Sequence, residues 1–331
     1  MNAEGILLLT AREIRSLLTL DECIAAVEHA FRAYGEGRAV APAVLSMHTD
    51  AGGFHVKAGM LELDRSYFAA KVNGNFPENN SRFGLPTIQG VIVLCDAANG
   101  VPLAVMDSRD ITSLRTAAAT AVAAKYLARL DSRTITICGC GNQGRIQLKA
   151  LSRICRLETA FAYDTDGEEA MRFSQDLTSE LNISVKPVSN LAAAVRQSDI
   201  CVTCTPSRQP LLGAGDVRPG TFIAAVGADN PQKHELHPSL MANSKVVCDI
   251  LEQCAVMGDL HHALDAGVMT LANVHAELGE IVAGKKPGRE SNEEIIIFDS
   301  TGMALQDVAA AAFLFEKAEK QRAGARLSFA D

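Results

Sequence analysis

The sequence predicts an α/β fold built from two domains, and three observations support this prediction. The chain has 331 residues, which is too long for one small hydrophobic core. From residue 134 onward, short apolar runs alternate with helical stretches, a pattern typical of a buried parallel sheet. Before residue 108, apolar runs are separated by hairpin signals instead, which indicates a β-rich unit with a helix.

The first third of the chain is predicted to contain one long helix and several strands. Apolar side chains recur at helical spacing up to Tyr34, and Thr19 together with Glu22 resembles a capping box. The pair Gly52-Gly53 is a hairpin signal between the first two strands. The strand-like runs of this region lie at residues 43–49, 53–61, 66–73, 91–96 and 101–107.

An alanine-dense segment at residues 111–130 is predicted to be a helix that connects the two domains. Its small side chains allow close packing against another backbone. The predicted strands that follow lie at residues 134–138, 160–163, 183–189, 199–206, 221–229, 245–250 and 295–301, and the predicted helices lie at residues 146–154, 167–181, 190–197 and 303–321.

Three glycines mark a turn that fits a dinucleotide. Gly139, Gly141 and Gly144 form a G-x-G-x-x-G pattern between the strand at 134–138 and the helix at 146–154. The first glycine allows the tight bend, the second lets a pyrophosphate approach the backbone, and the third lets helix and strand pack closely. The N–H groups and the positive dipole end of the helix then favour a phosphate. The alternative is a glycine-rich turn in another kind of α/β sheet.

An acidic residue, Asp164, ends the next predicted strand. A carboxylate at this strand end accepts hydrogen bonds from the adenosine ribose hydroxyls and repels a 2′-phosphate. Residues 165–168 contain no Arg or Lys that could offset this repulsion. The sequence therefore predicts NAD as the cofactor and makes NADP less favourable.

Nine cysteines occur, most of them in apolar runs, which favours reduced core thiols over a disulfide framework. Two pairs, Cys138 with Cys140 and Cys201 with Cys204, suggest zinc as an alternative. The first pair lies in the glycine turn, however, and the second lies in a strand whose neighbouring side chains point to opposite faces. Because no histidine lies near either pair, we predict packing residues and no metal.

Two polar residues follow later strands of the predicted parallel sheet. Thr205 and Asp229 each stand just past an apolar run, and ligands bind beyond the carboxyl ends of such strands. Thr205 is equally explained as a cap or turn residue. Asp229 stands where a proton-transfer group is useful, and its alternative role is an Asx turn before Pro231.

Several long stretches resemble the ornithine cyclodeaminase/μ-crystallin family, and within it the archaeal-type alanine dehydrogenase branch, from about Thr10 to Leu327. These stretches are AAKVNGNFPENN, GLPTIQGVIVLCD, ITSLRTAAATAVAAKYLAR, ICGCGNQG, CTPSRQP, VGADNPQKHEL and HAELGEIVAGKKPGRESNEEIIIFDSTGMALQDVA. The resemblance implies a homodimer. It also implies a substrate-binding and dimerisation domain at residues 1–120 and 305–331, around an inserted NAD-binding Rossmann domain at residues 121–304.

The resemblance also implies roles for individual residues. Lys71 and Arg115 match the cationic residues that hold the substrate carboxylate. The guanidinium of Arg115 can bind a carboxylate with two hydrogen bonds, and the ammonium of Lys71 adds a charge and a proton source. Asp229 matches the acid that exchanges a proton with the substrate nitrogen. The implied cofactor-binding residues are Thr87, Arg115, Gly139, Gly141, Asn142, Gln143, Gly144, Asp164, Thr205, Val226, Lys233, Ser300 and Thr301.

One departure from the family pattern affects the substrate site. Relatives carry a further cationic residue after a proline near residue 43, where this chain has Ala43 and Val44. A branch-specific arginine is replaced by His55, and Lys57 has the same strand parity as His55. We expect His55 and Lys57 to bind substrate and Lys57 to supply the missing charge. The alternative for both is a solvated strand face.

Together these features predict an NAD(H)-dependent oxidoreductase that acts on the C–N bond of a small α-amino or α-imino acid, as in alanine dehydrogenase or 1-pyrroline-2-carboxylate reductase. One alternative is an ornithine or lysine cyclodeaminase with catalytic NAD, which needs an extra acid for the distal amine; Glu62 and Asp64 are nearby in sequence. Another is a crystallin-like binding protein without turnover.

The net charge of −8, the absence of a basic run and the short N-terminal apolar stretch predict no nucleic-acid or membrane partner and a cytoplasmic location.

Overall fold

The computed structural model describes residues 5–328. Internal contacts divide the chain into two compact units: one holds the residues up to Arg115 together with those from Met303 onward, and the other holds Thr116–Gly302. The division falls inside the alanine-rich helix α4 (Ser108–Leu127). The substrate domain predicted from both chain ends includes residues 1–4 and 329–331, which lie outside the described residues.

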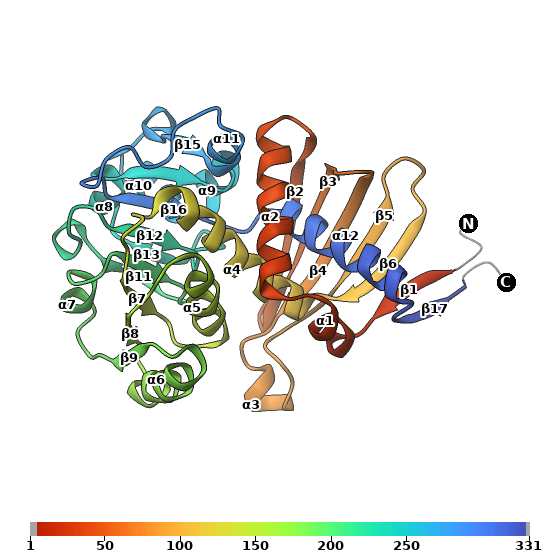
Figure 1. Cartoon of the computed structure of the whole chain (residues 1–331), viewed down its shortest axis with the longest axis horizontal. Coiled ribbons are helices and arrows are strands. Elements are labelled where there is room, and N and C mark those ends of the chain that lie inside the picture. The colour runs from red at the N-terminus through yellow and green to blue at the C-terminus, as the bar shows by residue number, and fades with distance from the viewer. Residues whose placement is uncertain (1–4, 329–331) are drawn as a thin grey trace. The chain divides into compact units, whose positions relative to one another are not determined.

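Strands dominate the first unit. Its elements are β1 (Ile6–Leu9), α1 (Ala11–Leu17), α2 (Leu20–Gly35), β2 (Ala39–Thr49), β3 (Gly52–Glu62), β4 (Ser66–Asn75), α3 (Asn79–Phe83), β5 (Ile88–Asp96), β6 (Pro102–Asp107), α12 (Ala304–Gln321) and β17 (Ala325–Leu327). The strands form one mixed sheet in the order β17-β1-β6-β5-β4-β3-β2, in which β1 and β6 are parallel. Helix α12 packs across β3 and β4 and against α2 (Figure 1).

The two faces of this sheet differ in what covers them. Side chains alternate along β3 and β4, so Lys57, Gly59 and Lys71 share the face that α12 covers, where Gly59 approaches Leu305. The opposite face exposes large apolar side chains of β2, β3, β4 and β5, namely Val40, Leu45, Met47, Phe54, Met60, Val72 and Val91. Exposed apolar faces of this kind are typical of interaction surfaces.

The second unit alternates strands and helices. Its elements are β7 (Thr134–Cys138), α5 (Asn142–Ile154), β8 (Thr159–Tyr163), α6 (Gly167–Leu181), β9 (Ser184–Pro187), α7 (Leu191–Val195), β10 (Ile200–Thr203), β11 (Arg208–Leu212), the 3-10 helix η1 (Ala214–Asp216), β12 (Phe222–Ala225), β13 (His234–Leu236), α8 (Pro238–Ala242), β14 (Lys245–Cys248), α9 (Leu251–Met257), α10 (Asp259–Asp265), the 3-10 helix η2 (Leu271–Asn273), β15 (Ala276–Glu277), α11 (Leu278–Val282) and β16 (Ile296–Asp299). Strands β11 and β13 form a separate small parallel sheet.

The main sheet of the second unit is parallel, in the order β15-β14-β16-β12-β10-β7-β8-β9. From β7, the chain adds β8 and β9 on one side and β10 and β12 on the other, which is the strand order of a Rossmann fold. The last strand, β16, then lies between β12 and β14. The order reverses between β7 and β10, and ligands bind beyond the carboxyl ends of the strands at such a point. The predicted α/β class, with a Rossmann domain and a second domain, is confirmed.

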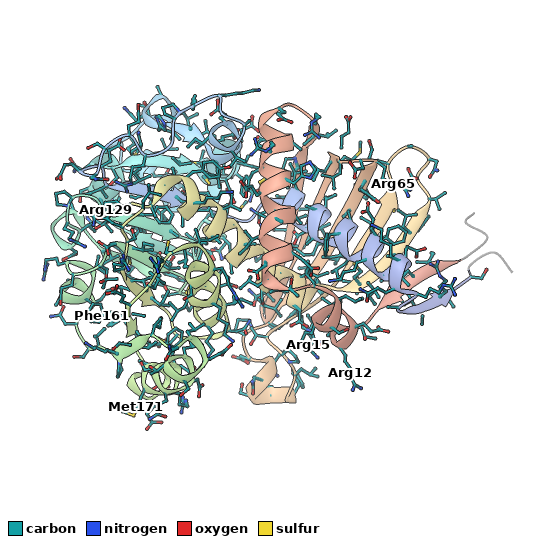
Figure 2. The ribbon with its side chains drawn as sticks, in the orientation of Figure 1. Arg12, Arg15, Arg65, Arg129, Phe161 and Met171 are labelled. Atoms are coloured by element: carbon teal, nitrogen blue, oxygen red, sulfur yellow. The ribbon has the colours of Figure 1, made fainter. Side chains whose placement is uncertain are left out.

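Helices cover the parallel sheet of the second unit. Helix α5 packs against β7, and α6 packs against β8 and β9. The carboxylate of Asp166 caps α6, and the exposed Met171 projects outward from this helix in Figure 2. The predicted boundaries of this helix, 167–181, are those observed, because capping and amphipathic spacing are both local signals.

One local prediction is wrong in its detail. The hairpin between β2 and β3 exists, but its turn is formed by Asp50 and Ala51, while Gly52 and Gly53 already belong to β3. An added Cβ on Gly52 would lie 2.7 Å from the ring of Phe76. This glycine therefore serves a close approach between side chain and backbone rather than the turn.

The described residues include no helix with the length and apolar character that a membrane span requires. The cytoplasmic location stays a prediction.

Candidate active site

The glycine turn follows β7 and leads into α5. Gly139 has a left-handed φ of +101°, and an added Cβ on Gly144 would overlap the carbonyl oxygen of Gly139, so both positions need glycine. At Gly141, which precedes α5, an added Cβ would meet nothing within 4 Å, and Gly141 has no side chain to cap the helix. Asn142 and Gln143 begin the helix. Open space thus adjoins the helix N-terminus, as phosphate binding requires.

The carboxylate of Asp164, which directly follows β8, lies against this turn. Its Oδ2 accepts a hydrogen bond from the Cys140 N–H at 2.8 Å, and its Oδ1 accepts one from the Asp166 N–H at 3.0 Å. Two further acids, Glu168 and Glu169, follow in the first turn of α6. The adjoining cavity of about 550 Å³ is lined by Tyr163, Asp164, Thr165, Ala170, Pro187 and Val188. Glu169 pairs with Arg145 and Arg172, and Glu168 pairs with Arg172, so the charge that opposes a 2′-phosphate here is mainly that of Asp164.

Thr205 lies in the loop that follows β10. Its Oγ1 donates to Glu235 Oε1 at 2.7 Å and accepts from the Ser207 N–H at 3.2 Å. The turn role that the sequence left open is therefore present, and the cofactor contact stays a prediction. Val226, which follows β12, donates its N–H to the Thr203 carbonyl at 2.9 Å.

Asp229 lies in the loop after β12, and its side chain is 51% exposed. Its Oδ1 is 2.7 Å from the Nζ of Lys233, so two residues that the sequence assigned to proton transfer and cofactor binding form an ion pair. The Asx turn that we considered for Asp229 is formed by its neighbour, because Asn230 Oδ1 accepts from the N–H groups of Gln232 and Lys233. The carboxylate of Asp229 is thus accessible to a proton-transfer partner.

Ser300 and Thr301 follow β16 and are both buried. The hydroxyl of Ser300 donates to Asp249 Oδ2 at 3.0 Å, and that of Thr301 donates to Asp249 Oδ1 at 3.3 Å. Asp249 also accepts from the Gly302 N–H at 2.7 Å. This acid, which the sequence did not single out, holds the end of β16 in place.

A buried ionic cluster lies under α12 in the first unit. Lys71 Nζ is 2.7 Å from Asp307 Oδ2, and Arg115 Nε is 3.1 Å from Asp307 Oδ1. Arg115 Nη1 also donates to Gln306 Oε1 at 2.9 Å. The relative exposures of Lys71, Arg115 and Asp307 are 3%, 5% and 2%. The structure therefore brings together the two cations predicted to hold a substrate carboxylate, with one acid between them.

The charge state of this cluster follows from its burial. Burial and the Arg115 guanidinium lower the pKa of Lys71 to about 7, against the opposing effect of Asp307. Burial disfavours the ionised form of Asp307, but Arg115 and Lys71 outweigh it and lower the pKa of this carboxyl. Lys57 also lowers the pKa of both Lys71 and Asp307. Three basic side chains thus act on one carboxylate, so positive charge exceeds negative charge in this cluster.

The predicted substrate residues of β3 lie on the same sheet face as Lys71. Lys57 is directly opposite Lys71 in the β3–β4 register. His55 lies opposite Asn73, and its Nδ1 is 3.0 Å from Ser46 Oγ of β2. Thr87 lies in the loop before β5, where its carbonyl accepts from the Phe76 N–H. On β2, Val44 lies opposite Lys57, whereas Ala43 lies opposite Ala58 and so points to the other face of the sheet. Lys57 can therefore replace a charge missing on the Val44 side, but not one on the Ala43 side.

Asp307 and Gln306 are the residues that sequence reasoning missed in this cluster. They lie in the run ALQDVAAAAFLF, where Asp307 is an isolated acid within an apolar, alanine-rich helix. An acid in such a helix is rarely buried without a partner, so the sequence does indicate that Asp307 has a cationic or hydrogen-bonding partner. Its partners, however, are distant in sequence and could not be named.

The cysteines offer little metal chemistry. Burial raises the pKa of Cys201 and of Cys254, and a neutral thiol is a poor ligand. Ligand atoms of Cys248, Cys254 and Asp299 lie within 4.8 Å of one another. The carboxylate of Asp299, however, already accepts the N–H groups of Asp259 and Leu260. We infer no metal site from this group.

Comparisons with known proteins identify relatives that match nearly the whole chain. The family model described as "Ornithine cyclodeaminase/mu-crystallin family" matches residues 5–322. An alanine dehydrogenase of Archaeoglobus fulgidus is 40% identical over 324 residues, which cover 98% of each chain. A solved archaeal alanine dehydrogenase dimer with bound NAD has a TM-score of 0.94 at 40% identity, covering 98% of this chain and 99% of that one. The Thermococcus litoralis Delta(1)-pyrroline-2-carboxylate reductase, solved with NADH and L-proline, has a TM-score of 0.92 at 35% identity, covering 97% and 100%.

Proposed function

This chain belongs to the ornithine cyclodeaminase/mu-crystallin family, and we propose that it is an NAD(H)-dependent oxidoreductase acting on the C–N bond of a small α-amino or α-imino acid. The observation that carries the proposal is the buried cluster of Lys71, Arg115 and Asp307, with Lys57 opposite Lys71. Its excess of positive charge suits the carboxylate that such substrates share.

We assign the cofactor to the second unit. Gly139, Gly141 and Gly144 would hold the pyrophosphate at the start of α5, and Asp164 would accept from the adenosine ribose hydroxyls. NAD(H) supplies or accepts the hydride. The carboxylate of Asp164 supports NAD over NADP. The further contacts proposed for Thr87, Arg115, Asn142, Gln143, Thr205, Val226, Lys233, Ser300 and Thr301 rest on the family resemblance.

We assign substrate binding to the first unit. Arg115 presents a guanidinium that suits a carboxylate fork, and Lys71 adds a second cation beside it. The lowered pKa of Lys71, about 7, also lets its ammonium give up a proton near neutral pH. Asp229 would exchange a proton with the substrate nitrogen, a role that its accessible carboxylate permits. Positioning and charge then carry much of the rate.

We propose that the chain forms a homodimer through the apolar face of the first unit's sheet. Leu45 is 55% exposed in the middle of β2, the edge strand of this sheet, and covering it would remove apolar surface from water. A Leu45→Lys substitution should shift the mass found by sedimentation from dimer to monomer. Val256→Lys, at an equally exposed position (55%) on α9, is the matched control and should leave the mass unchanged.

A substrate panel tests the activity. We expect NADH oxidation with pyruvate or another small keto acid plus ammonia or methylamine, or with a cyclic imine such as 1-pyrroline-2-carboxylate, and weaker rates with NADPH. Asp229→Asn should lower kcat strongly while NADH binding persists. A nearly full kcat in that variant would refute the proton-transfer role. Ammonia release from ornithine without net NADH formation would identify a cyclodeaminase, and NADH binding without any turnover would favour a carrier.

A further inference from the structure

One buried acid of the second unit has contacts that none of the roles above explains. Glu235 lies on β13 and is fully buried. Its Oε1 accepts from both the N–H and the Oγ1 of Thr205 at 2.7 Å, and its Oε2 accepts from the Gly227 N–H at 2.9 Å. One carboxylate therefore ties the loop after β10 to the loop after β12. These loops carry Thr205 and Asp229.

The contact between Glu235 and the second loop leaves no free space. An added Cβ on Gly227 would lie 2.5 Å from the Glu235 carboxyl carbon. The backbone at this point therefore rests directly on the carboxylate, and a side chain there would push the two apart. Asp229 is two residues further along, and its N–H donates to the Gly227 carbonyl at 3.1 Å. The position of the Asp229 loop thus depends on Glu235.

The backbone of Glu235 is itself held by further buried acids. Asp259 Oδ1 accepts from the N–H groups of Glu235 and Leu236 at 2.8 and 2.9 Å. The Asp299 carboxylate accepts in turn from the N–H groups of Asp259 and Leu260 at 3.3 and 2.9 Å. Three carboxylates are therefore joined through backbone amides from β13 to the end of β16. This arrangement fixes the backbone of Glu235, and its two carboxylate oxygens accept hydrogen bonds from the two loops.

We propose that Glu235 is a positioning residue for the cofactor: as an anion it holds Thr205 and Gly227 in the binding-competent arrangement, and its protonation releases one of these contacts. The proposal rests on the proposed function, because it takes the cofactor to bind beyond β10 and β12. Its physical basis is that both oxygens accept from N–H or O–H donors. A proton on Oε2 would face the Gly227 N–H, and a proton on Oε1 would face the Thr205 N–H, so one N–H contact would be lost in either case.

The surroundings of Glu235 place its titration near neutral pH. Burial and the neighbouring Asp259 raise the pKa of Glu235 to about 7, against the opposing hydrogen bonds from Thr205. The other titratable groups that face it are the thiols of Cys138, Cys201 and Cys204, whose own pKa values burial raises, so they remain neutral. Glu235 therefore takes up a proton at a higher pH than an ordinary carboxyl, and it shares this titration with Asp259, whose pKa burial also raises.

NADH titrations of the full chain by fluorescence, between about pH 6 and about pH 8.5, test the proposal. For the wild-type chain, the Kd should rise several-fold as the pH falls through about 7. Glu235→Gln should bind NADH about tenfold more weakly at the upper pH, because the loss of one charge-assisted hydrogen bond has about this effect. Its Kd should change much less with pH. Glu294→Gln, whose carboxylate contacts Lys245 and Ser291 instead, is the matched control and should follow the wild type.

A second variant separates positioning from folding. Glu235→Asp keeps an ionisable group but is too short to span both loops, so it should bind weakly and keep the pH dependence. Equal NADH affinity and an equal pH profile in wild type and Glu235→Gln would overturn the positioning role and leave the proposed function intact. A wild-type chain that binds no NADH at any pH would refute the proposed function, and this role with it.

Discussion

Two glycines of the same turn should respond differently to replacement by alanine: Gly144→Ala should lower stability, and Gly141→Ala should weaken NADH binding. At Gly144, an added Cβ would overlap the Gly139 carbonyl oxygen and would lie 3.1 Å from both its carbonyl carbon and the Ile137 Cγ2. Alanine inside a helix usually stabilises by about 1 kcal/mol relative to glycine. Overpacking against a backbone that cannot shift costs up to about 3 kcal/mol. We therefore expect Gly144→Ala to lower the free energy of unfolding of this unit by about 2 kcal/mol.

At Gly141, the same substitution meets open space. No atom lies within 4 Å of the added Cβ, and a φ of −70° suits any residue. Alanine is a poorer N-cap than glycine, which costs at most about 1 kcal/mol. The new methyl group would, however, occupy the space proposed for the pyrophosphate. We expect Gly141→Ala to raise the Kd of NADH at least tenfold, or about 1.4 kcal/mol.

Two measurements separate these effects. Urea denaturation followed by circular dichroism reports the stability of both variants, and NADH fluorescence titration reports binding. Gly167→Ala is the control, because its added Cβ also meets nothing within 4 Å at the start of α6. A Gly144→Ala protein as stable as the wild type would refute the packing argument. A Gly141→Ala protein with wild-type NADH affinity would show that the phosphate does not approach this backbone.

Three further predictions concern single charged residues. Asp307→Ala should lower the free energy of unfolding by about 3 to 5 kcal/mol, because it leaves buried cations without their acid; the thermal melting curve measures this, and an unchanged melting temperature would contradict it. Asp164→Arg should weaken NADH binding and shift the ratio of NADPH to NADH affinity toward NADPH, as parallel titrations would show, since it removes the repulsion of a 2′-phosphate. The kcat/KM for a carboxylate substrate should fall as the pH rises through about 7, since Lys71 then loses its charge; Lys71→Arg should flatten this part of the pH profile, and an equally steep decline would contradict it.

The fold was largely predictable from local signals. Helical spacing and capping residues located α2 and α6, and apolar runs located most strands of the two large sheets, but not the short strands β15 and β17. Gly52 shows where local signals are insufficient. A glycine pair between two strands indicates a turn, but here the ring of Phe76, from beyond the next strand, explains the glycine instead. Such a contact forms only when the sheet assembles.

The site was predictable to the extent that single residues carry distinctive chemistry. The glycine turn and Asp164 come together as expected, since strand, turn and helix are continuous in sequence. Asp307 and Glu235 were missed for a different reason. The partners of Asp307 are Lys71 and Arg115, from elements near the other end of the chain. Glu235 lies on a three-residue strand without any periodic pattern. In both cases the role is defined by partners that only the tertiary structure supplies.

These two buried acids also show how environment separates residues of similar chemistry. Asp307 lies between cations that lower its pKa, whereas Glu235 faces another acid and has a raised pKa. As the pH falls from about 8 to about 6, Asp307 remains ionised and Lys71 becomes more fully charged, while Glu235 gains a proton. Acidification should therefore raise the affinity for a substrate carboxylate and lower the affinity for the cofactor. The pH optimum of kcat/KM for the carboxylate substrate should then be higher when NADH is limiting than when NADH is saturating. At limiting NADH, the measured rate also reflects the loss of cofactor binding at low pH.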